Sequence, residues 1–228
     1  MQHISIITRE THQKNESTPS KIICIGRNYV AHIQELGNEI PTQMVMFVKP
    51  NSAISEQLNS RHQQVLHYET ELCFSVQNNR LLAVAVGLDL TKRELQSELK
   101  RRQLPWERAK AFNGSAVFSP FITLPAEMDA TMQTWSFTLE INGQLMQLGH
   151  SQLMMYSLKH ILDDLAQFMD LEDGDVLMTG TPKGVGVVTK DSWFTVKLWQ
   201  GLDYESDEQL KLAMKQQQPL LTHSWQAC

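Results

Sequence analysis

The sequence predicts a mainly β protein with peripheral helices, in the α+β class. Strand-like runs outnumber helical patterns, and the two do not alternate regularly, as they would in a doubly wound parallel sheet. The chain has 228 residues, enough for one domain of the larger sort. Hydrophobic residues make up 42% and charged residues 20%, which excludes a disordered or fibrous chain.

Taken in order along the chain, the elements begin with a polar arm over residues 1–20, followed by a single domain over 21–228. Two helices are expected, at 93–103 and at 151–170, the second because apolar residues recur every three or four positions, with Ser151 as its N-cap. Strands are expected at 22–25, 44–48, 65–76, 81–90, 136–141, 175–178 and 193–199.

Several classes of function are excluded by composition. The net charge of −5 and the lack of a basic patch exclude nucleic acid as the main partner. Three widely spaced cysteines form no CxxC pair, so neither a zinc ribbon nor a redox motif is present. No apolar stretch reaches the length of a membrane span or a signal peptide, and a cytoplasmic location is therefore expected.

The stretch HYETELCFSV at 67–76 carries the first functional signal. Strand residues alternate between faces, so His67, Glu69 and Glu71 share the face opposite an apolar row. For a bare E-x-E pattern, a solvated polar face on an edge strand is the commoner explanation. The sharper interpretation is a cation site, because neighbouring carboxylates repel each other unless something neutralises them.

Asp89 strengthens the cation interpretation. It follows the apolar run LLAVAVGL at 81–88, and a carboxylate at the end of a buried strand needs a partner or a metal. The alternative is a cap on the next helix, a role that Thr91 could also fill. Two glutamates and one aspartate form an all-oxygen ligand set, which suits Mg²⁺ or Mn²⁺, is compatible with Ca²⁺ and argues against zinc.

Six ordered motifs make the chain similar to the fumarylacetoacetate hydrolase family, in its short single-domain branch, over about residues 21–190. The motifs are Gly26-Arg27-Asn28-Tyr29 with His32 and Glu35, Phe47-Val48-Lys49-Pro50, His67-Tyr68-Glu69-Thr70-Glu71, Gly87-Leu88-Asp89-Leu90-Thr91 with Arg93 and Gln96, Pro105-Trp106 with Ala109-Lys110-Ala111-Phe112, and Leu177 to Gly186. Acylpyruvate hydrolases and oxaloacetate-handling enzymes are the members it resembles most. Asn113 departs from the Asp that many members carry, and the chain after about residue 190 matches poorly.

The resemblance implies a β-roll like that of the family's C-terminal domain, a homodimer, and a metal site made of Glu69, Glu71 and Asp89, with Mg²⁺ as the usual ion. His32 and Glu35, three residues apart, would be a base and the carboxylate that orients it. In an unrelated chain such a pair is more often an inconsequential surface contact.

The resemblance assigns the remaining candidates to the substrate. Lys110 would meet an oxygen that gains negative charge, although an exposed lysine is the commoner case. Arg93 and Gln96 would reach the substrate rather than form a solvated helix face, and Arg27 and Lys49 are candidates for a distal carboxylate. Thr181, in a glycine-rich loop that lacks both phosphate-binding patterns, would hold the substrate carboxylate.

The expected function is hydrolysis of a carbon–carbon bond in a 3-acylpyruvate, a small 2-oxo acid, through a metal-stabilised enolate. Oxaloacetate decarboxylation and oxaloacetate keto–enol tautomerisation remain alternatives, because all three reactions share the enolate. A non-enzymic metal-binding protein is disfavoured, since it would need neither the His32–Glu35 pair nor Lys110.

Overall fold

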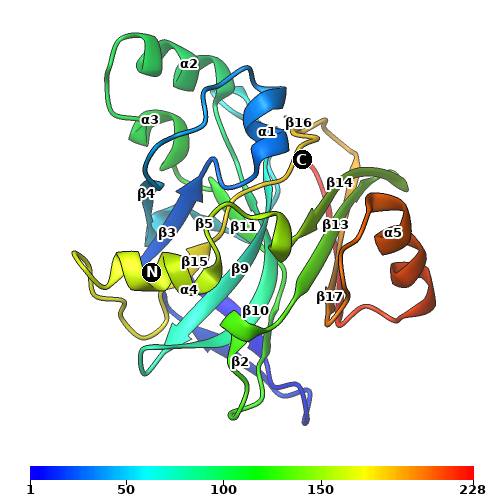
Figure 1. Cartoon of the computed structure of the whole chain (residues 1–228). Coiled ribbons are helices and arrows are strands. Elements are labelled where there is room, and N and C mark those ends of the chain that lie inside the picture. Colours follow the sequence, from blue (N-terminus) through cyan, green and yellow to red (C-terminus); the bar gives the residue numbers. More distant parts are fainter.

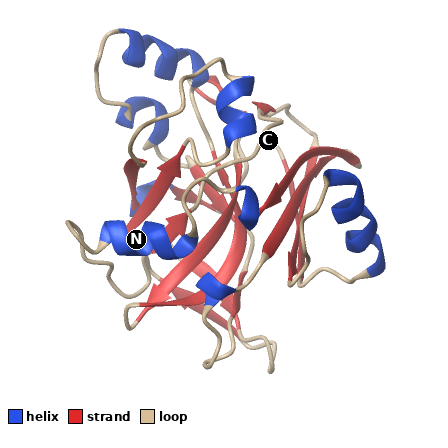
Figure 2. Ribbon diagram, in the orientation of Figure 1, coloured by secondary structure: helices blue, strands red, loops and turns tan.

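The computed structural model covers all 228 residues and is built on a ten-stranded sheet (Figures 1 and 2). The strands run in the order β2-β1-β12-β10-β9-β15-β3-β4, and β11 pairs with both β10 and β5. Their bounds are β1 (Ile4–Ile7), β2 (Lys14–Ser17), β3 (Lys21–Gly26), β4 (Val45–Pro50), β5 (Ile54–Ser55), β9 (Thr70–Gln77), β10 (Arg80–Asp89), β11 (Ala116–Phe118), β12 (Phe121–Thr123) and β15 (Val176–Met178).

A second, four-stranded antiparallel sheet faces the first (Figure 2). It consists, in spatial order, of β14 (Gln144–His150), β13 (Trp135–Ile141), β17 (Trp193–Gln200) and β18 (Leu221–Gln226). The largest hydrophobic cluster fills the space between the two sheets, where the ring of Phe74 meets that of Trp135 edge to face. Two short pairs complete the strands: β6 (Arg61–His62) with β7 (Gln64–Val65), and β8 (His67–Tyr68) with β16 (Gly186–Val187).

Strand β9 shows why the large sheet can hold charged residues in its interior. Leu72 and Phe74 belong to the core between the sheets, whereas Cys73 belongs to a second buried cluster on the opposite face. The alternation predicted for this segment is therefore correct, but the opposite face is not solvated. Close approach at that face requires Gly87, because a Cβ there would lie 2.7 Å from the Phe118 ring.

The helices lie outside the sheets, as predicted, but there are five α-helices where two were expected: α1 (Val30–Glu35), α2 (Arg93–Arg101), α3 (Glu107–Lys110), α4 (Leu158–Leu165) and α5 (Asp207–Gln216). Helices α1, α2 and α3 gather at one end of the large sheet, at the top of Figure 1. Helix α5 covers the outer face of the four-stranded sheet, where Leu210 and Met214 pack against Trp199. No helix is long and apolar enough to span a membrane.

The expectation of an arm over residues 1–20 is wrong. Strand β1 pairs in parallel with β12, and β2 pairs with β1, so this segment forms one edge of the large sheet. The buried side chains of Ile4 and Ile6 belong to the second hydrophobic cluster. The alternation in ISII spans only four residues, and the polar stretch after it makes the whole segment look like a loop.

The prediction of a single helix over residues 151–170 is also wrong. Residues Ser151–Leu153 form a 3₁₀ turn, and the α-helix begins only after Ser157, whose hydroxyl accepts from the His160 N–H. The intervening backbone is held by Asn28. Its carbonyl accepts from the Met155 N–H at 2.8 Å, and its side chain both accepts from Tyr156 N–H (2.7 Å) and donates to the Tyr156 carbonyl (3.1 Å). These long-range bonds override the helical periodicity.

Candidate metal centre and active site

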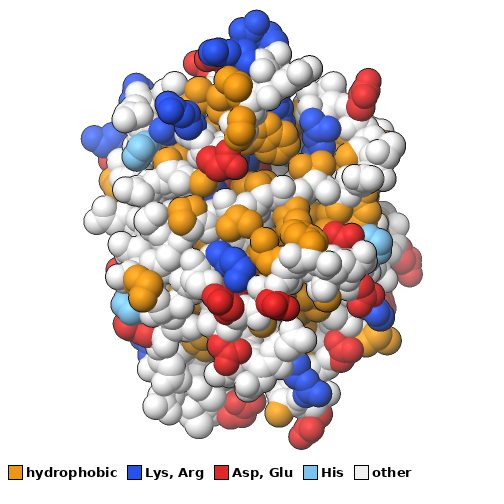
Figure 3. Space-filling model, turned by 90° about the vertical axis from the view of Figure 1, so that its left-hand side faces the viewer, with side chains coloured by type: hydrophobic (Ala, Val, Ile, Leu, Met, Phe, Trp, Pro, Cys, Tyr) orange, Lys and Arg blue, Asp and Glu red, His pale blue; other side chains and the backbone are white.

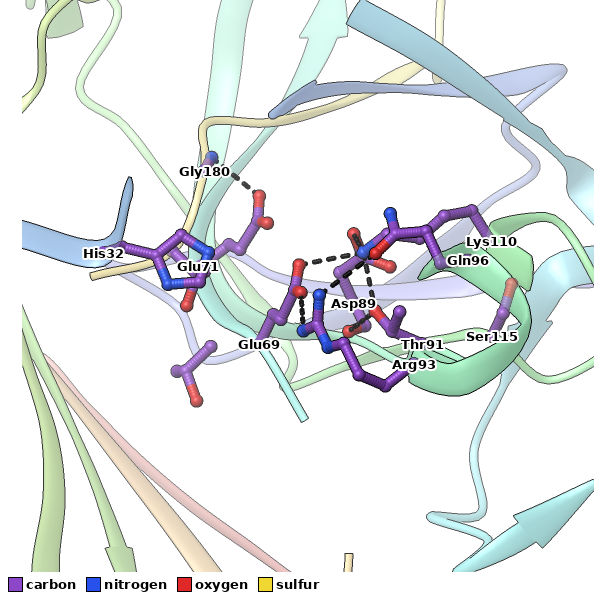
Figure 4. Close-up of polar contacts among 12 residues, drawn as sticks. His32, Glu69, Glu71, Asp89, Thr91, Arg93, Gln96, Lys110, Ser115 and Gly180 are labelled. Carbon is purple, nitrogen blue, oxygen red and sulfur yellow. Dashed lines mark hydrogen bonds and ion pairs between the residues drawn. The ribbon is translucent and has the colours of Figure 1, made fainter. Parts of the chain in front are cut away.

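Two neighbouring strands bring the three acidic residues together. Glu71 lies on β9 opposite Gly87 of β10, and the Asp89 N–H donates to the Glu69 carbonyl at 2.8 Å. Each of the three carboxylates contributes one oxygen to a group in which all ligand atoms lie within 4.8 Å of one another. All three residues are buried, and Figure 4 shows their side chains lying close together. We refer to Glu69, Glu71 and Asp89 as the acidic triad.

Two cations neutralise one side of the triad. The Lys110 ammonium donates to Glu69 at 2.8 Å, to Asp89 at 2.7 Å and to the Thr91 hydroxyl at 2.6 Å. Arg93 also pairs with Glu69. Burial alone would raise the pKa of the Glu69 carboxyl, but Lys110 and then Arg93 hold it well below its usual range. Glu69 is therefore a charged carboxylate.

Glu71 has no such cation. It accepts one hydrogen bond, from the Gly180 N–H at 2.7 Å, and burial together with the charges of Asp89 and Glu69 raises its pKa well above the usual value. Oδ1 of Asp89 lies 2.8 Å from the Lys49 ammonium but accepts no hydrogen bond. The Glu71 carboxylate, which has no cationic partner, beside an Asp89 oxygen that accepts no hydrogen bond, fits a divalent cation, and oxygen-only ligands favour a hard one.

Helix α1 supplies the candidate base. Nδ1 of His32 lies 3.2 Å from Oε2 of Glu35, whose other oxygen accepts from the Gly184 N–H at 2.9 Å. The carboxylate thus fixes one ring nitrogen and leaves Nε2 free. Burial lowers the pKa of His32 although Glu69 and Glu35 oppose the shift, so the neutral imidazole is favoured. Figure 4 shows His32 and Lys110 on opposite sides of the triad.

One cleft collects nine of the eleven residues that the sequence singled out: Arg27, His32, Glu69, Glu71, Asp89, Arg93, Gln96, Lys110 and Thr181. Glu35 lies behind His32. Lys49, expected to bind a distal carboxylate, is fully buried behind Asp89, where its ammonium also bonds the Lys110 carbonyl and Ser115. That expectation is corrected: Lys49 positions Asp89 and the backbone of Lys110, because it has no surface in the cleft.

Gln147 is the main structural residue that the sequence did not reveal. Its side chain accepts from the Thr70 N–H at 3.0 Å and donates to the Thr181 hydroxyl at 2.9 Å and the Pro182 carbonyl at 2.8 Å. It thereby joins the triad's strand to the loop at 179–186. Nothing in its sequence neighbourhood signals this role, since all of its partners are distant in the chain.

Comparison with known proteins identifies the family of the chain. The model of the C-terminal domain of fumarylacetoacetate hydrolase matches residues 21–217 of the chain. The chain belongs to the fumarylacetoacetate hydrolase family. The match extends beyond the limit of about residue 190 suggested by the motifs alone, so strands β13, β14 and β17 of the four-stranded sheet lie within the family domain.

Relatives in this family include oxaloacetate tautomerases. The mitochondrial oxaloacetate tautomerase FAHD1 of Bos taurus is 36% identical over 186 residues, covering 75% of this chain and 83% of that protein. Oxaloacetate tautomerase YcgM of Escherichia coli is 33% identical over 193 residues, covering 78% of this chain and 87% of that protein.

Solved structures of the family share the fold. A protein from Oleispira antarctica superposes with a TM-score of 0.82 at 28% identity, covering 98% of this chain and 99% of that chain. Fumarylpyruvate hydrolase from Pseudomonas aeruginosa, in complex with Mn²⁺ and pyruvate, gives a TM-score of 0.76 at 26% identity, covering 86% and 91%. The mainly β fold with peripheral helices is thus confirmed, and a divalent-metal site is consistent with it.

Proposed function

We propose that the protein is a metal-dependent oxaloacetate keto–enol tautomerase. The observation that carries the proposal is the placement of one neutral base, His32, and one ammonium, Lys110, on opposite sides of a buried acidic triad (Figure 4). The tautomerases among its relatives support the choice of reaction. This reverses the order expected from the sequence, where hydrolysis stood first.

The triad would hold the ion, and Mg²⁺ is our choice because three carboxylates suit a small hard cation. When bound, such an ion acts as a Lewis acid that polarises the 2-oxo group and makes the C3 protons more acidic. Two polar side chains would position the 2-oxo acid. They are Thr181, whose hydroxyl is oriented by Gln147, and Gln96, which accepts from Arg93 at 3.0 Å.

The chain's own residues would move and hold the proton. Nε2 of His32 takes a proton from C3, and Glu35 stabilises the imidazolium that results. The three N–H donors of Lys110 are taken by Glu69, Asp89 and Thr91, so Lys110 stabilises the negative charge that collects on the 2-oxo oxygen through its own positive charge. The enolate oxygen then takes a proton from solvent while His32 returns its proton to solvent, so the number of protons balances and no bond between carbon atoms breaks.

Hydrolysis of 3-acylpyruvates is the second candidate, favoured by the similarity to a fumarylpyruvate hydrolase holding Mn²⁺ and pyruvate. In that reaction His32 would activate a water instead of taking the C3 proton. Decarboxylation of oxaloacetate would use the same enolate without an activated water.

Solvent deuterium separates the candidates. Purified protein with Mg²⁺ is given oxaloacetate, acetylpyruvate or fumarylpyruvate in D₂O, and C3 exchange, enol absorbance and pyruvate release are followed together. A tautomerase accelerates exchange and enol decay of oxaloacetate without releasing pyruvate. Rapid pyruvate release from an acylpyruvate would select the hydrolase, and release from oxaloacetate the decarboxylase. Loss of all turnover with EDTA, restored by Mg²⁺, is expected in each case.

A further inference from the structure

Helix α2 presents three polar side chains to the cleft at helical spacing. Arg93, Gln96 and Lys100 are separated by three and four residues, so they lie on one face, and all three line the cleft. Arg93 and Gln96 were expected there from the sequence. Lys100 was not, because the adjacent Arg101 and Arg102 made it look like part of a solvated basic helix end.

The charges lining the cleft do not cancel pairwise. Arg93 and Lys110 are paired with the carboxylates of Glu69 and Asp89. Lys100 and Arg27 have no acidic partner within salt-bridge distance. Lys100 lies over the Trp106 ring, with Nζ 4.8 Å from its centroid, and Arg27 donates only to the Asn38 side chain (3.2 Å) and the Glu39 carbonyl.

Both unpaired cations are in energetically unfavourable environments. Arg27 adopts a left-handed backbone conformation, with φ of 56°, which is unfavourable for a residue other than glycine. Burial and then the charges of Arg27, Arg93 and Lys110 lower the pKa of Lys100 to about 8, with only Glu69 opposing them. An ammonium that is half-buried among cations is stabilised when an anion binds beside it.

We propose that Lys100, with Arg27, forms a subsite for the second carboxylate of a dicarboxylic 2-oxo acid. The inference rests on the proposed function in that it places the 2-oxo acid group of the substrate at the triad. One carboxylate then lies at the ion site, and the other lies between two cations that have no other anion. Substrates with a neutral tail would leave both cations unpaired, so the chain selects dianions.

Oxaloacetate and pyruvate form a matched pair for the test, since pyruvate lacks only the second carboxylate. C3 deuterium exchange and calorimetric binding are measured for both, with Mg²⁺, in wild type and Lys100→Met. We expect KM and Kd for oxaloacetate to rise on the order of 10- to 100-fold, the range for a lost charge-assisted hydrogen bond, and those for pyruvate to change little. Lys100→Arg keeps the charge and should retain most of the preference for oxaloacetate.

Arg101→Gln is the control for net charge, because Arg101 lies on the same helix but is exposed. It should leave both substrates unaffected. Equal losses for oxaloacetate and pyruvate in Lys100→Met, or no loss for either, would overturn the subsite while leaving the tautomerase proposal intact. Binding of oxaloacetate that depends on Lys100 but gives no C3 exchange would support the subsite and overturn the tautomerase. A wild-type protein that binds neither acid would overturn both.

Discussion

At the scale of single residues, the members of the acidic triad differ in how they are compensated. Glu69 has two cationic partners, whereas Glu71 has one backbone N–H and two neighbouring carboxylates. Substitution by glutamine should therefore act in opposite directions in the metal-free protein. Glu71→Gln should stabilise it by about 1–3 kcal/mol, because glutamine removes the cost of burying an ionisable carboxyl beside two carboxylates, and Glu69→Gln should destabilise it by about 3–5 kcal/mol, because a buried pair is broken.

Thermal unfolding with EDTA and with Mg²⁺ measures this contrast. Mg²⁺ should raise the Tm of the wild type and have little effect on either variant, since each lacks a ligand. The same sign of change for both variants in EDTA would contradict the charge distribution described here. If Mg²⁺ raised the Tm of both variants as much as that of the wild type, the triad would not be the metal site.

His32 gives a residue-scale prediction for pH. Burial lowers the pKa of His32, and the charge of Arg93 lowers it further. Glu69 and Glu35 raise it but do not cancel the effect of burial. Because the base must be neutral, the acidic limb of kcat/KM for enolisation should fall below pH 6.5, the ordinary histidine value. Glu35→Gln removes a contribution that raises the pKa, so it should move this limb to still lower pH and reduce the maximum rate.

The pH profiles of wild type and Glu35→Gln, measured by C3 exchange of oxaloacetate, test this assignment. His32→Ala should lose about 10²–10⁴-fold in rate and have no acidic limb from this group. A limb that moves to higher pH in Glu35→Gln, or one that persists in His32→Ala, would show that another group is the base.

At the scale of elements, the buried ends of β15 and β3 are joined through Asp175. Its carboxylate accepts from the Ser20 hydroxyl, the Lys21 N–H and the Glu172 N–H, and it pairs with the Lys21 ammonium at 2.6 Å. Burial raises its pKa, but these bonds outweigh burial and lower it overall. Asp175→Asn should destabilise the protein by about 3 kcal/mol, because the ammonium of Lys21 loses its buried partner and keeps only Glu172 at 3.7 Å.

Denaturant unfolding as a function of pH checks this junction. Because the folded-state pKa is lowered, the stabilisation should be present above about pH 4 and disappear as pH falls through the folded value. Asp173→Asn is the control, since Asp173 accepts one exposed hydrogen bond from the Asn78 N–H, and it should cost less than about 1 kcal/mol. A penalty for Asp175→Asn that stays constant down to pH 2 would contradict the ion pair.

Elements with a strong local pattern could be predicted from the sequence, and those determined by distant partners could not. The runs that became β3, β10 and β13 were located within one or two residues, because their apolar residues are continuous or alternate. Helix α4 was extended too far because Asn28 holds the backbone before Ser157, and β1 was missed because it has only four residues. The triad could be found because Glu69 and Glu71 share one strand face and Asp89 ends the apolar strand that follows, whereas Gln147 and Lys100 act through contacts that no local pattern signals.

At the scale of the whole molecule, the large sheet ends at β4, which has a free edge. Val45, Met46, Phe47 and Val48 of this strand are half-buried and form an apolar hollow with Pro105 and Trp106. Figure 3 views the side of the molecule that carries β4 and shows hydrophobic side chains gathered in its upper half. An exposed apolar edge strand favours pairing with another chain, so we propose that this face contacts a second copy in the homodimer implied by the family resemblance.

Sedimentation equilibrium at micromolar concentration should therefore give twice the chain mass of 26.1 kDa. Val48 belongs to neither hydrophobic cluster of the sheet, so Val48→Glu should introduce a charge at the interface and shift the mass toward the monomer, with far-ultraviolet circular dichroism unchanged. Leu212→Glu alters an equally apolar but exposed residue on α5 and should leave the dimer intact. A wild-type monomer would contradict the dimer, and a dimer that tolerates Val48→Glu would place its interface away from β4.

Because Val45 and Phe47 also line the cleft, pairing at this face would bring the second copy beside the mouth of the active site. Val48→Glu should then raise KM for oxaloacetate as the dimer dissociates.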